Sequence, residues 1–200
     1  MAAVPALVGL AAGLLGGWWV ACWALQVAAL LVLLFFRDPE RSPAGDGIIS
    51  PADGRVVAVV VEDTGHPLEP ACRRRVSIFM SPLNVHINRI PDSGVVENLN
   101  YHRGSFRAAY APEASVVNES NAISVRAEGG YPYVVVQIAG WLCRRIVCKV
   151  TAGQSVVRGQ RLGLIMFGSR VDVFLPEGFE VQVRHGQRVK AGYTLIAKAS

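Results

Sequence analysis

The first 36 residues constrain this chain most, because they contain no Asp, Glu, Lys or Arg and only one strongly polar side chain, Gln26. As one helix the run would measure about 54 Å, against a hydrocarbon core of about 30 Å. A signal peptide would need a basic start and a shorter apolar run, and a soluble helix of this length would show a polar face. The run therefore predicts a hydrophobic membrane segment over residues 1–36.

A pair of glycines, Gly16-Gly17, divides the apolar run into two pieces. Either Trp18–Phe36 crosses the membrane once, or Pro5–Leu15 and Trp18–Phe36 form a helical hairpin that turns at the glycines. Arg37 and Arg41 follow at once, and basic residues next to a membrane segment mark its cytoplasmic side. We therefore expect the protein at the cytoplasmic face of the cell membrane, with spanning helix and hairpin both open.

The rest of the chain, residues 37–200, carries all 20 Lys and Arg and all 15 Asp and Glu. Its charge density is ordinary for a globular domain, and its length suits one domain with a real core. The cysteines include no C-x-x-C pair, so neither a disulfide framework nor a metal site is predicted, and we expect reduced thiols at Cys22, Cys72, Cys143 and Cys148.

Short β-branched runs bounded by Gly, Pro, Asp and Asn dominate the chain after Arg41, as is typical of strands. No later stretch keeps a helical apolar stripe for three turns, so we expect helical turns at most, with one near residues 82–85. The domain is predicted to be mainly β. Examples of the expected strands are 54–61, 75–80, 133–139, 144–150 and 169–175.

An internal repeat sharpens the fold. Residues 150–162 and 183–195 both read V-x-x-G-Q-x-V-x-x-G-x-x-L. Glycines six apart around a valine suit two tight turns that flank a short strand. This pattern is typical of barrel-sandwich hybrid folds, which resemble biotinyl and lipoyl carrier domains, and residues 50–56 have a similar character. The lysine motif of a carrier is absent, so we expect the fold without the carrier function.

One serine stands out as a candidate for chemistry. Gly168-Ser169 interrupts the apolar run 162–176, where a glycine usually marks a β-bulge or a close approach. A bulge that exposes a peptide carbonyl to the next hydroxyl has the geometry for an N→O acyl shift, although a plain structural bulge explains the same glycine. A second Gly-Ser pair, Gly104-Ser105, lies outside such a run.

Two further residues could assist that serine. His86 and Asn88 alternate with apolar residues and so share one face of an extended segment, and Asp53 lies in a Ser-Pro-Ala-Asp-Gly turn. Brought together, Asp53, His86 and Ser169 would form an arrangement in which a carboxylate orients an imidazole that activates a hydroxyl. A turn aspartate and a structural histidine are the alternatives for the first two.

Four motifs in this order resemble short-form phosphatidylserine decarboxylases: residues 50–54, 80–89, 137–145 and 167–173. The resemblance implies a proenzyme that cuts itself between Gly168 and Ser169, giving a large chain 1–168 and a small chain 169–200. Ser169 would then become a pyruvoyl group. Long-form members carry a second histidine where Arg89 stands, so the base role falls on His86, with Asp53 as its carboxylate.

The resemblance also implies the reaction. The pyruvoyl carbonyl would condense with the amine of phosphatidylserine and accept electrons as CO2 leaves, giving phosphatidylethanolamine without a metal. No nucleic-acid partner is expected, and a homo-oligomer stays open. Anionic membrane lipids are expected partners of the basic residues Arg73–Arg75, Arg144-Arg145, Arg184, Arg188 and Lys190.

Two alternatives stay beside this interpretation. A membrane-anchored barrel-sandwich domain could be a non-enzymatic adaptor of an export assembly, although such adaptors usually carry long helical hairpins and face the periplasm. A pyruvoyl-dependent decarboxylase of a soluble amino acid would use the same Gly-Ser chemistry, but it gives no reason for the apolar first 36 residues.

Overall fold

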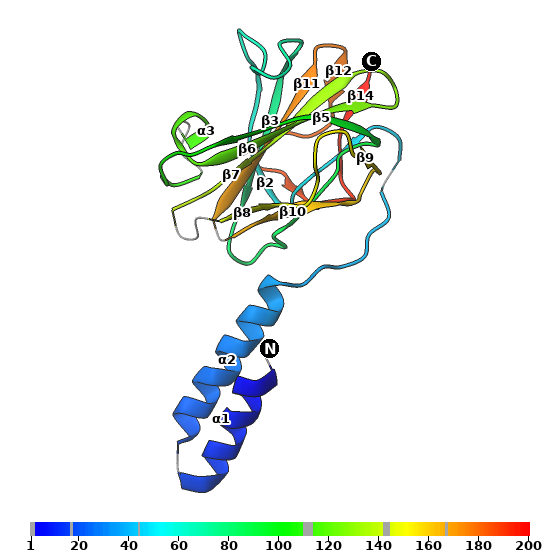
Figure 1. Cartoon of the computed structure of the whole chain (residues 1–200). Helices are drawn as coiled ribbons and strands as arrows, with labels where there is room; N and C mark the ends of the chain where they lie inside the picture. Colours follow the sequence, from blue (N-terminus) through cyan, green and yellow to red (C-terminus); the bar gives the residue numbers. More distant parts are fainter. Residues whose placement is uncertain (1–2, 17, 44, 110–113, 142–144, 167) are drawn as a thin grey trace. The chain divides into compact units, whose positions relative to one another are not determined.

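The structure is a computed structural model that describes residues 3–16, 18–43, 45–109, 114–141, 145–166 and 168–200 (Figure 1). The chain forms two compact units, Met1–Pro39 and Glu40–Ser200. The first unit is helical. The second unit is mainly β, as the sequence predicts.

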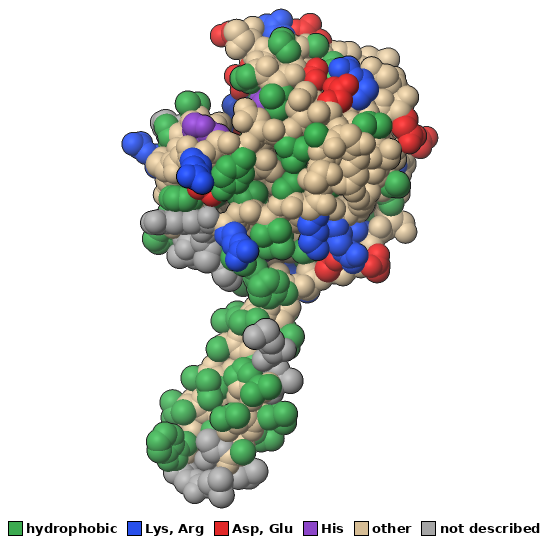
Figure 2. Space-filling model, viewed as in Figure 1, with side chains coloured by type: hydrophobic (Ala, Val, Ile, Leu, Met, Phe, Trp, Pro, Cys, Tyr) green, Lys and Arg blue, Asp and Glu red, His purple; other side chains and the backbone are tan. Residues whose placement is uncertain are grey.

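Two helices form the first unit: α1 spans Ala3–Gly16 and α2 spans Trp19–Phe35. They lie side by side as a hairpin, and their approach is close at Gly9, where an added Cβ would lie 3.3 Å from the carbonyl oxygen of Cys22 (Figure 1). Their described surface is hydrophobic in the view of Figure 2. Within the described part of the chain, no helix has both the length and the apolar character needed to cross a membrane.

The described residues of the second unit form three sheets. The strands of the largest are β2 (Gly54–Val61), β3 (Cys72–Met80), β5 (Gly94–His102), β6 (Ser120–Ala127), β7 (Pro132–Ile138), β9 (Ser155–Val156), β11 (Ser169–Pro176) and β13 (Arg188–Val189). They run in the order β13-β2-β3-β11-β7-β6-β5-β9, every neighbouring pair is antiparallel, and the sheet curls into a half barrel.

Two three-stranded sheets complete the unit. One has the strands β1 (Ile48–Ile49), β12 (Phe179–Val181) and β14 (Leu195–Ala199), with β14 in the middle. The other has β4 (Ile87–Arg89), β8 (Ile146–Cys148) and β10 (Arg161–Ile165), with β10 in the middle. A single-turn helix, α3, spans Ala114–Val117.

The strands expected from the sequence are present in the structure. The run 54–61 coincides with β2, and the other four overlap β3, β7, β8 and β11. Near residues 82–85, where a helical turn at most is expected, the chain makes a single hydrogen-bonded turn, in which the Asn84 N–H donates to the Ser81 carbonyl at 2.9 Å. The six residues 81–86 between β3 and β4, which include Pro82, have room for this single turn.

Both copies of the repeat form the expected turns. Gly153 and Gly159 flank β9 with φ of 80° and 84°, and Gly186 and Gly192 flank β13 with φ of 83° and 72°. Glycine suits all four positions because it adopts positive φ without steric cost. The two repeat copies therefore have the same local backbone.

Each repeat copy also pairs with a segment of matching sequence. Residues 50–56 and 90–96 both have Pro second, Gly fifth and Val seventh, and they pair with the second and first repeat copy respectively. The Gly186 N–H donates to the Val56 carbonyl at 2.8 Å, and the Gly153 N–H donates to the Val96 carbonyl at 2.7 Å. The large sheet thus consists of two similar halves, β13-β2-β3-β11 and β7-β6-β5-β9.

The large sheet has two buried faces. Successive side chains of β11 point to one face and then to the other, as in any strand. Val171, Val173 and Leu175 point into the main hydrophobic core. Phe174 packs against a smaller cluster on the opposite face, where Asp172 forms an ion pair. Ser169 has the same parity as the core residues, so its side chain lies at the end of the main core.

Candidate active site

Ser169 begins β11 and is fully buried. In the sheet it pairs with Met80, the last residue of β3, and its Oγ lies 3.6 Å from the Met80 Sδ. The hydroxyl therefore lies inside the unit, shielded from water, at the point where two central strands end.

Gly168 lies outside β11, in the turn that precedes it, so the β-bulge expected at Gly168-Ser169 is wrong. The apolar run 162–176 is divided here because β10 and β11 belong to different sheets. Gly168 has φ of 67°, and an added Cβ would meet no atom within 4 Å. The requirement for glycine is therefore conformational, and another residue would cost about 1–2 kcal/mol.

His86 lies just before β4 and is 1% exposed. Its Nδ1 is 2.9 Å from the backbone carbonyl oxygen of Asn84. Because a carbonyl only accepts, this contact favours the proton on Nδ1 and leaves the lone pair of the neutral ring on Nε2. A ring in this tautomer can take a proton at Nε2.

Side-chain hydrogen bonds stabilise the turn that contains Asn84. The Asn84 Oδ1 accepts hydrogen bonds from the Ser81 backbone N–H and from the Ser81 hydroxyl, both at 2.8 Å. This turn connects the end of β3, opposite Ser169, to His86. The Met-Ser-Pro-Leu-Asn-Val-His segment thus holds the histidine ring in place through a backbone carbonyl.

A row of buried amides extends from Met80 into the sheet. The Asn88 Nδ2 donates to the Met80 Sδ at 3.7 Å, and the Asn88 Oδ1 accepts from the Gln137 Nε2 at 2.9 Å. The Gln137 Oε1 in turn accepts from the Asn121 Nδ2 at 3.2 Å. The sequence pattern puts Asn88 and His86 on one face and includes Gln137 in a family motif, but it assigns no role to Gln137 or Asn121. A signal that could have pointed to both residues is an amide side chain at a position of a strand where the other inward-facing residues are apolar.

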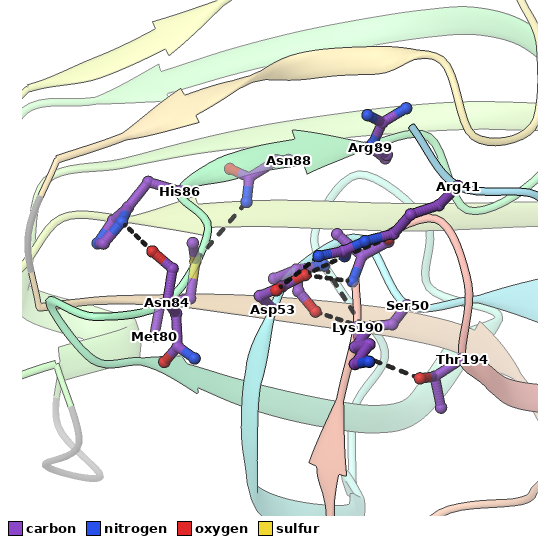
Figure 3. A network of polar contacts seen from close by, with 12 residues as sticks. Arg41, Ser50, Asp53, Met80, Asn84, His86, Asn88, Arg89, Lys190 and Thr194 are labelled. Atoms are coloured by element: carbon purple, nitrogen blue, oxygen red, sulfur yellow. Dashed lines mark hydrogen bonds and ion pairs between the residues drawn. The ribbon is translucent and has the colours of Figure 1, made fainter. Parts of the chain in front are cut away.

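Asp53 is placed differently from its expected position. Its carboxylate forms an ion pair with Arg41, whose Nη2 donates to the Asp53 Oδ2 at 3.0 Å, and its Oδ1 accepts from the Ala191 N–H at 2.7 Å (Figure 3). Among the described residues, neither this carboxylate nor the Ser169 hydroxyl is hydrogen-bonded to His86. The expected contact between Asp53 and His86 is therefore not made, because Arg41 and Ala191 bind the carboxylate.

Arg89 takes the place of the second histidine of long-form decarboxylases. It is 7% exposed, its Nη1 donates to the Gly159 carbonyl at 2.9 Å, and its side chain is directed away from His86 (Figure 3). A guanidinium stays protonated in proteins and cannot act as a base. Of these two positions, only His86 offers a basic nitrogen.

The chain is similar to proteins of one known family. The sequence profile described as phosphatidylserine decarboxylase matches residues 28–197. The phosphatidylserine decarboxylase proenzyme of Nitrosomonas europaea is 46% identical over 195 residues, which cover 96% of this chain and 88% of the relative. The proenzymes of that name from Salinibacter ruber and Nitratidesulfovibrio vulgaris are each 43% identical, over 92% and 90% of this chain and 86% and 85% of the relatives.

The match covers most of the β unit, including Gly168-Ser169, and defines the class of the protein as a decarboxylase. The chain belongs to the phosphatidylserine decarboxylase family. Neither the adaptor nor the decarboxylase of a soluble amino acid is favoured by these relatives.

Proposed function

We propose that this protein decarboxylates phosphatidylserine to phosphatidylethanolamine and CO2 after it cuts itself between Gly168 and Ser169. The observation that carries the proposal is the burial of Ser169, directly after a glycine in the left-handed conformation and at the polar end of the core. The names of the curated relatives support the substrate and the processing.

The cut would use the chain's own residues. The Ser169 Oγ attacks the Gly168 carbonyl carbon while the Nε2 of His86 takes the hydroxyl proton, and the peptide bond becomes an ester as the Ser169 nitrogen is released as an amine. β-Elimination then frees the carboxylate of Gly168 and leaves dehydroalanine at position 169. A water molecule adds to the imine tautomer of the dehydroalanine and ammonia leaves, which gives the pyruvoyl group. The Asn84 carbonyl keeps the His86 tautomer suited to the first step.

The residues around Ser169 fit a small polar group at this position. Asn88 and Gln137 supply buried amides close to Met80, the direct neighbour of Ser169, and the space beside Gly168 is open. When formed, the pyruvoyl group supplies a carbonyl for the substrate amine and an acceptor for the electrons released with CO2.

Asp53 enters the proposal as a supporting carboxylate. It lines the same cavity as Asn84, whose carbonyl contacts His86. Its direct partners are Arg41 and Ala191, so its effect on the cut is expected to be smaller than that of His86.

The large and small chains would stay together after the cut. Strand β11 belongs to the small chain and pairs with β3 on one side and β7 on the other, both from the large chain. Three further strands of the small chain, β12, β13 and β14, also take part in sheets. The backbone hydrogen bonds of a central strand would hold the small chain in place. The paired repeats also support a barrel-sandwich hybrid as the finer description of this unit.

Mass spectrometry of the denatured protein tests the cut. The wild type should separate into pieces of about 18 kDa and about 3.5 kDa, by the 168:32 division of 21.5 kDa. The small piece should lack a free N-terminal amine and react with borohydride or phenylhydrazine, as a ketone does. Ser169→Ala should stay intact and inactive, because a methyl group cannot attack the Gly168 carbonyl.

Ser105→Ala is the matched control at the second Gly-Ser pair. Ser105 is exposed and its Oγ donates to the Val117 carbonyl at 2.9 Å, so this variant should process normally. Full decarboxylase activity in Ser169→Ala, or a small piece that begins with an ordinary serine, would overturn the proposal. A protein that decarboxylates without ever being cut would favour another enzyme class, and a protein that is neither cut nor active as a decarboxylase would favour the adaptor.

We further propose that the helical hairpin attaches the protein to the cytoplasmic face of the cell membrane. The hydrophobic surface of α1 and α2 supports this location. Arg41 is not expected to act as an orientation signal, because it forms the ion pair with Asp53 and its side chain is only 14% exposed. Arg37→Glu alone should therefore weaken correct orientation while the β unit still folds. Unchanged protease protection in inverted vesicles would contradict this expectation.

A further inference from the structure

A cavity of about 610 Å³ lies beside the turn that connects β3 to His86. Three cations line it: Arg55 from β2, Arg188 from β13 and Lys190 just after β13. Phe79 and Leu83 give it an apolar side. The cavity therefore combines positive charge with a hydrophobic wall.

Two of these cations are placed where they repel each other. Arg55 and Arg188 are directly paired across β2 and β13, and both side chains are exposed. Like charges at opposed positions of two strands destabilise a sheet. The one carboxylate in the cavity wall, Asp53, already forms its ion pair with Arg41. Within the described residues, no ion pair involves Arg55, Arg188 or Lys190, so the cavity has a net positive charge.

The fold itself does not require this pair. In the other half of the sheet the corresponding pair is Val95 opposite Ser155, which carries no charge. The cations thus occur in only one of two halves that share their backbone, as expected for a binding function.

Two of the other basic residues expected to contact lipid are already paired. Arg73 forms an ion pair with Glu177 at 2.8 Å, and Arg75 forms one with Glu62 at 2.5 Å. The expected lipid contact of Arg73–Arg75 is therefore less well supported than one at the cavity. Arg144 lies outside the described residues.

We infer that this cavity binds the phosphate of an anionic phospholipid headgroup at the membrane surface. Arg55, Arg188 and Lys190 offer donors and charge for the phosphate. Leu83, at 72% exposure, offers an apolar side chain to the lipid interface, which a site for free phosphate would not need. The inference rests on the proposed function for its lipid substrate and adds where a headgroup is held.

The position of the cavity explains why binding there would serve catalysis. Asn84 lines the cavity and its carbonyl contacts His86, so one short turn lies between the bound headgroup and the histidine. A headgroup in this cavity would bring the membrane surface to the entrance of the site that contains Ser169.

The test measures lipid binding by the full chain with Ser169→Ala, kept in a neutral detergent, by titration calorimetry. The probes are dihexanoyl-phosphatidylglycerol, which is anionic and has no amine to react, dihexanoyl-phosphatidylcholine and inorganic phosphate. Arg55→Gln with Arg188→Gln should weaken phosphatidylglycerol binding about tenfold or more, and added salt should weaken binding further. Phosphatidylcholine and inorganic phosphate should bind much more weakly than phosphatidylglycerol.

The matched control is Arg103→Gln with Arg107→Gln, which removes the same charge from two exposed arginines outside the cavity. It should change binding less than twofold. An equal loss in this control, equal binding of phosphatidylcholine, or displacement of the lipid by an equal concentration of phosphate would overturn the inference. If the double variant fails to fold, Lys190→Gln gives the same test with a loss of about fivefold. Because Ser169→Ala cannot be cut, this result is independent of whether the wild type processes itself.

Discussion

The two halves of the large sheet share a backbone but differ in their side chains. Gly54 and Gly94 occupy matching positions, and an added Cβ would lie 2.1 Å from the Phe79 carbonyl oxygen in one half and 2.2 Å from the Arg126 carbonyl oxygen in the other. The register shifts directly afterwards in both halves, in residues 56–58 and 96–98. The similarity of the two halves thus extends to the close backbone contacts at Gly54 and Gly94.

The turn residue next to these glycines shows where the halves diverge. The Asp53 carboxylate accepts from the Ala191 N–H at 2.7 Å, and the Ser93 hydroxyl accepts from the Arg158 N–H at 3.0 Å. Both side chains therefore hold the repeat turn that faces them. Only Asp53 also carries a charge, which Arg41 balances.

This difference indicates that the features common to both halves stabilise the fold and that the charged features of one half serve the site. The shared backbone contacts hold the sheet together, whereas the ionised turn residue and the cationic cavity belong to the first half, and His86 follows directly after it. The following experiments treat the two halves as each other's control.

The largest expected effect is on the rate of the cut, in a comparison of His86, beside the candidate site, with His102 in β5. His86→Ala should slow the cut by about 100-fold or more, because a general base contributes about 10²–10⁴-fold. His102→Ala, in the exposed end of β5, should process normally. The fraction of cut chain over time, followed by gel electrophoresis, measures both. Normal processing in His86→Ala would move the base role to another residue.

A pair of glycine substitutions tests the structural symmetry. Gly54→Ala and Gly94→Ala should each lower the free energy of unfolding by about 1–3 kcal/mol, since the added methyl would overlap a strand backbone. Chemical denaturation measures the change. If one variant were stable and the other were not, the two halves would not be energetically equivalent.

A third comparison concerns the two turn residues. Asp53→Asn should lower the free energy of unfolding by about 1–3 kcal/mol through loss of the Arg41 ion pair, and should slow the cut less than His86→Ala does. Ser93→Ala should cost about 1 kcal/mol and leave the cutting rate unchanged. A cutting rate equally slow in Asp53→Asn and His86→Ala would indicate a direct partnership of the two residues.

The smallest effect is a pH dependence of stability. His66 contacts the Phe174 ring at 4.9 Å, and burial lowers its pKa, with the charge of Asp172 opposing. A lowered pKa in the folded state favours the neutral ring, so its stabilising contribution is present above the unfolded pKa of about 6.5 and is lost as the pH falls through the folded pKa. His66→Gln should flatten the fall in unfolding free energy between pH 7.5 and pH 5. An unchanged slope would assign it to other groups.

Local sequence signals were sufficient for several parts of this protein. The β-branched runs predicted the main strands, the glycine spacing predicted the turns of the repeat, and the motifs predicted the family. These features depend on residues close in the chain, because backbone conformation and strand alternation are local properties. Gly168-Ser169 was found in the same way, since a glycine in an apolar run is visible without a structure.

The arrangement of side chains around that serine depended on strand pairing instead. The sequence by itself determined that the chain has an uncharged start, a mainly β domain and a Gly-Ser pair of this family. Only the tertiary structure decided that Asp53 meets Arg41, that Gln137 joins Asn88, and that Arg55 lies opposite Arg188. The physical reason for the last two contacts is register: the partners are far apart in the chain, and a shift of one residue in the pairing would turn each side chain to the other face of the sheet. Arg41 and Asp53 lie outside the strands, so their contact depends on how two loops meet.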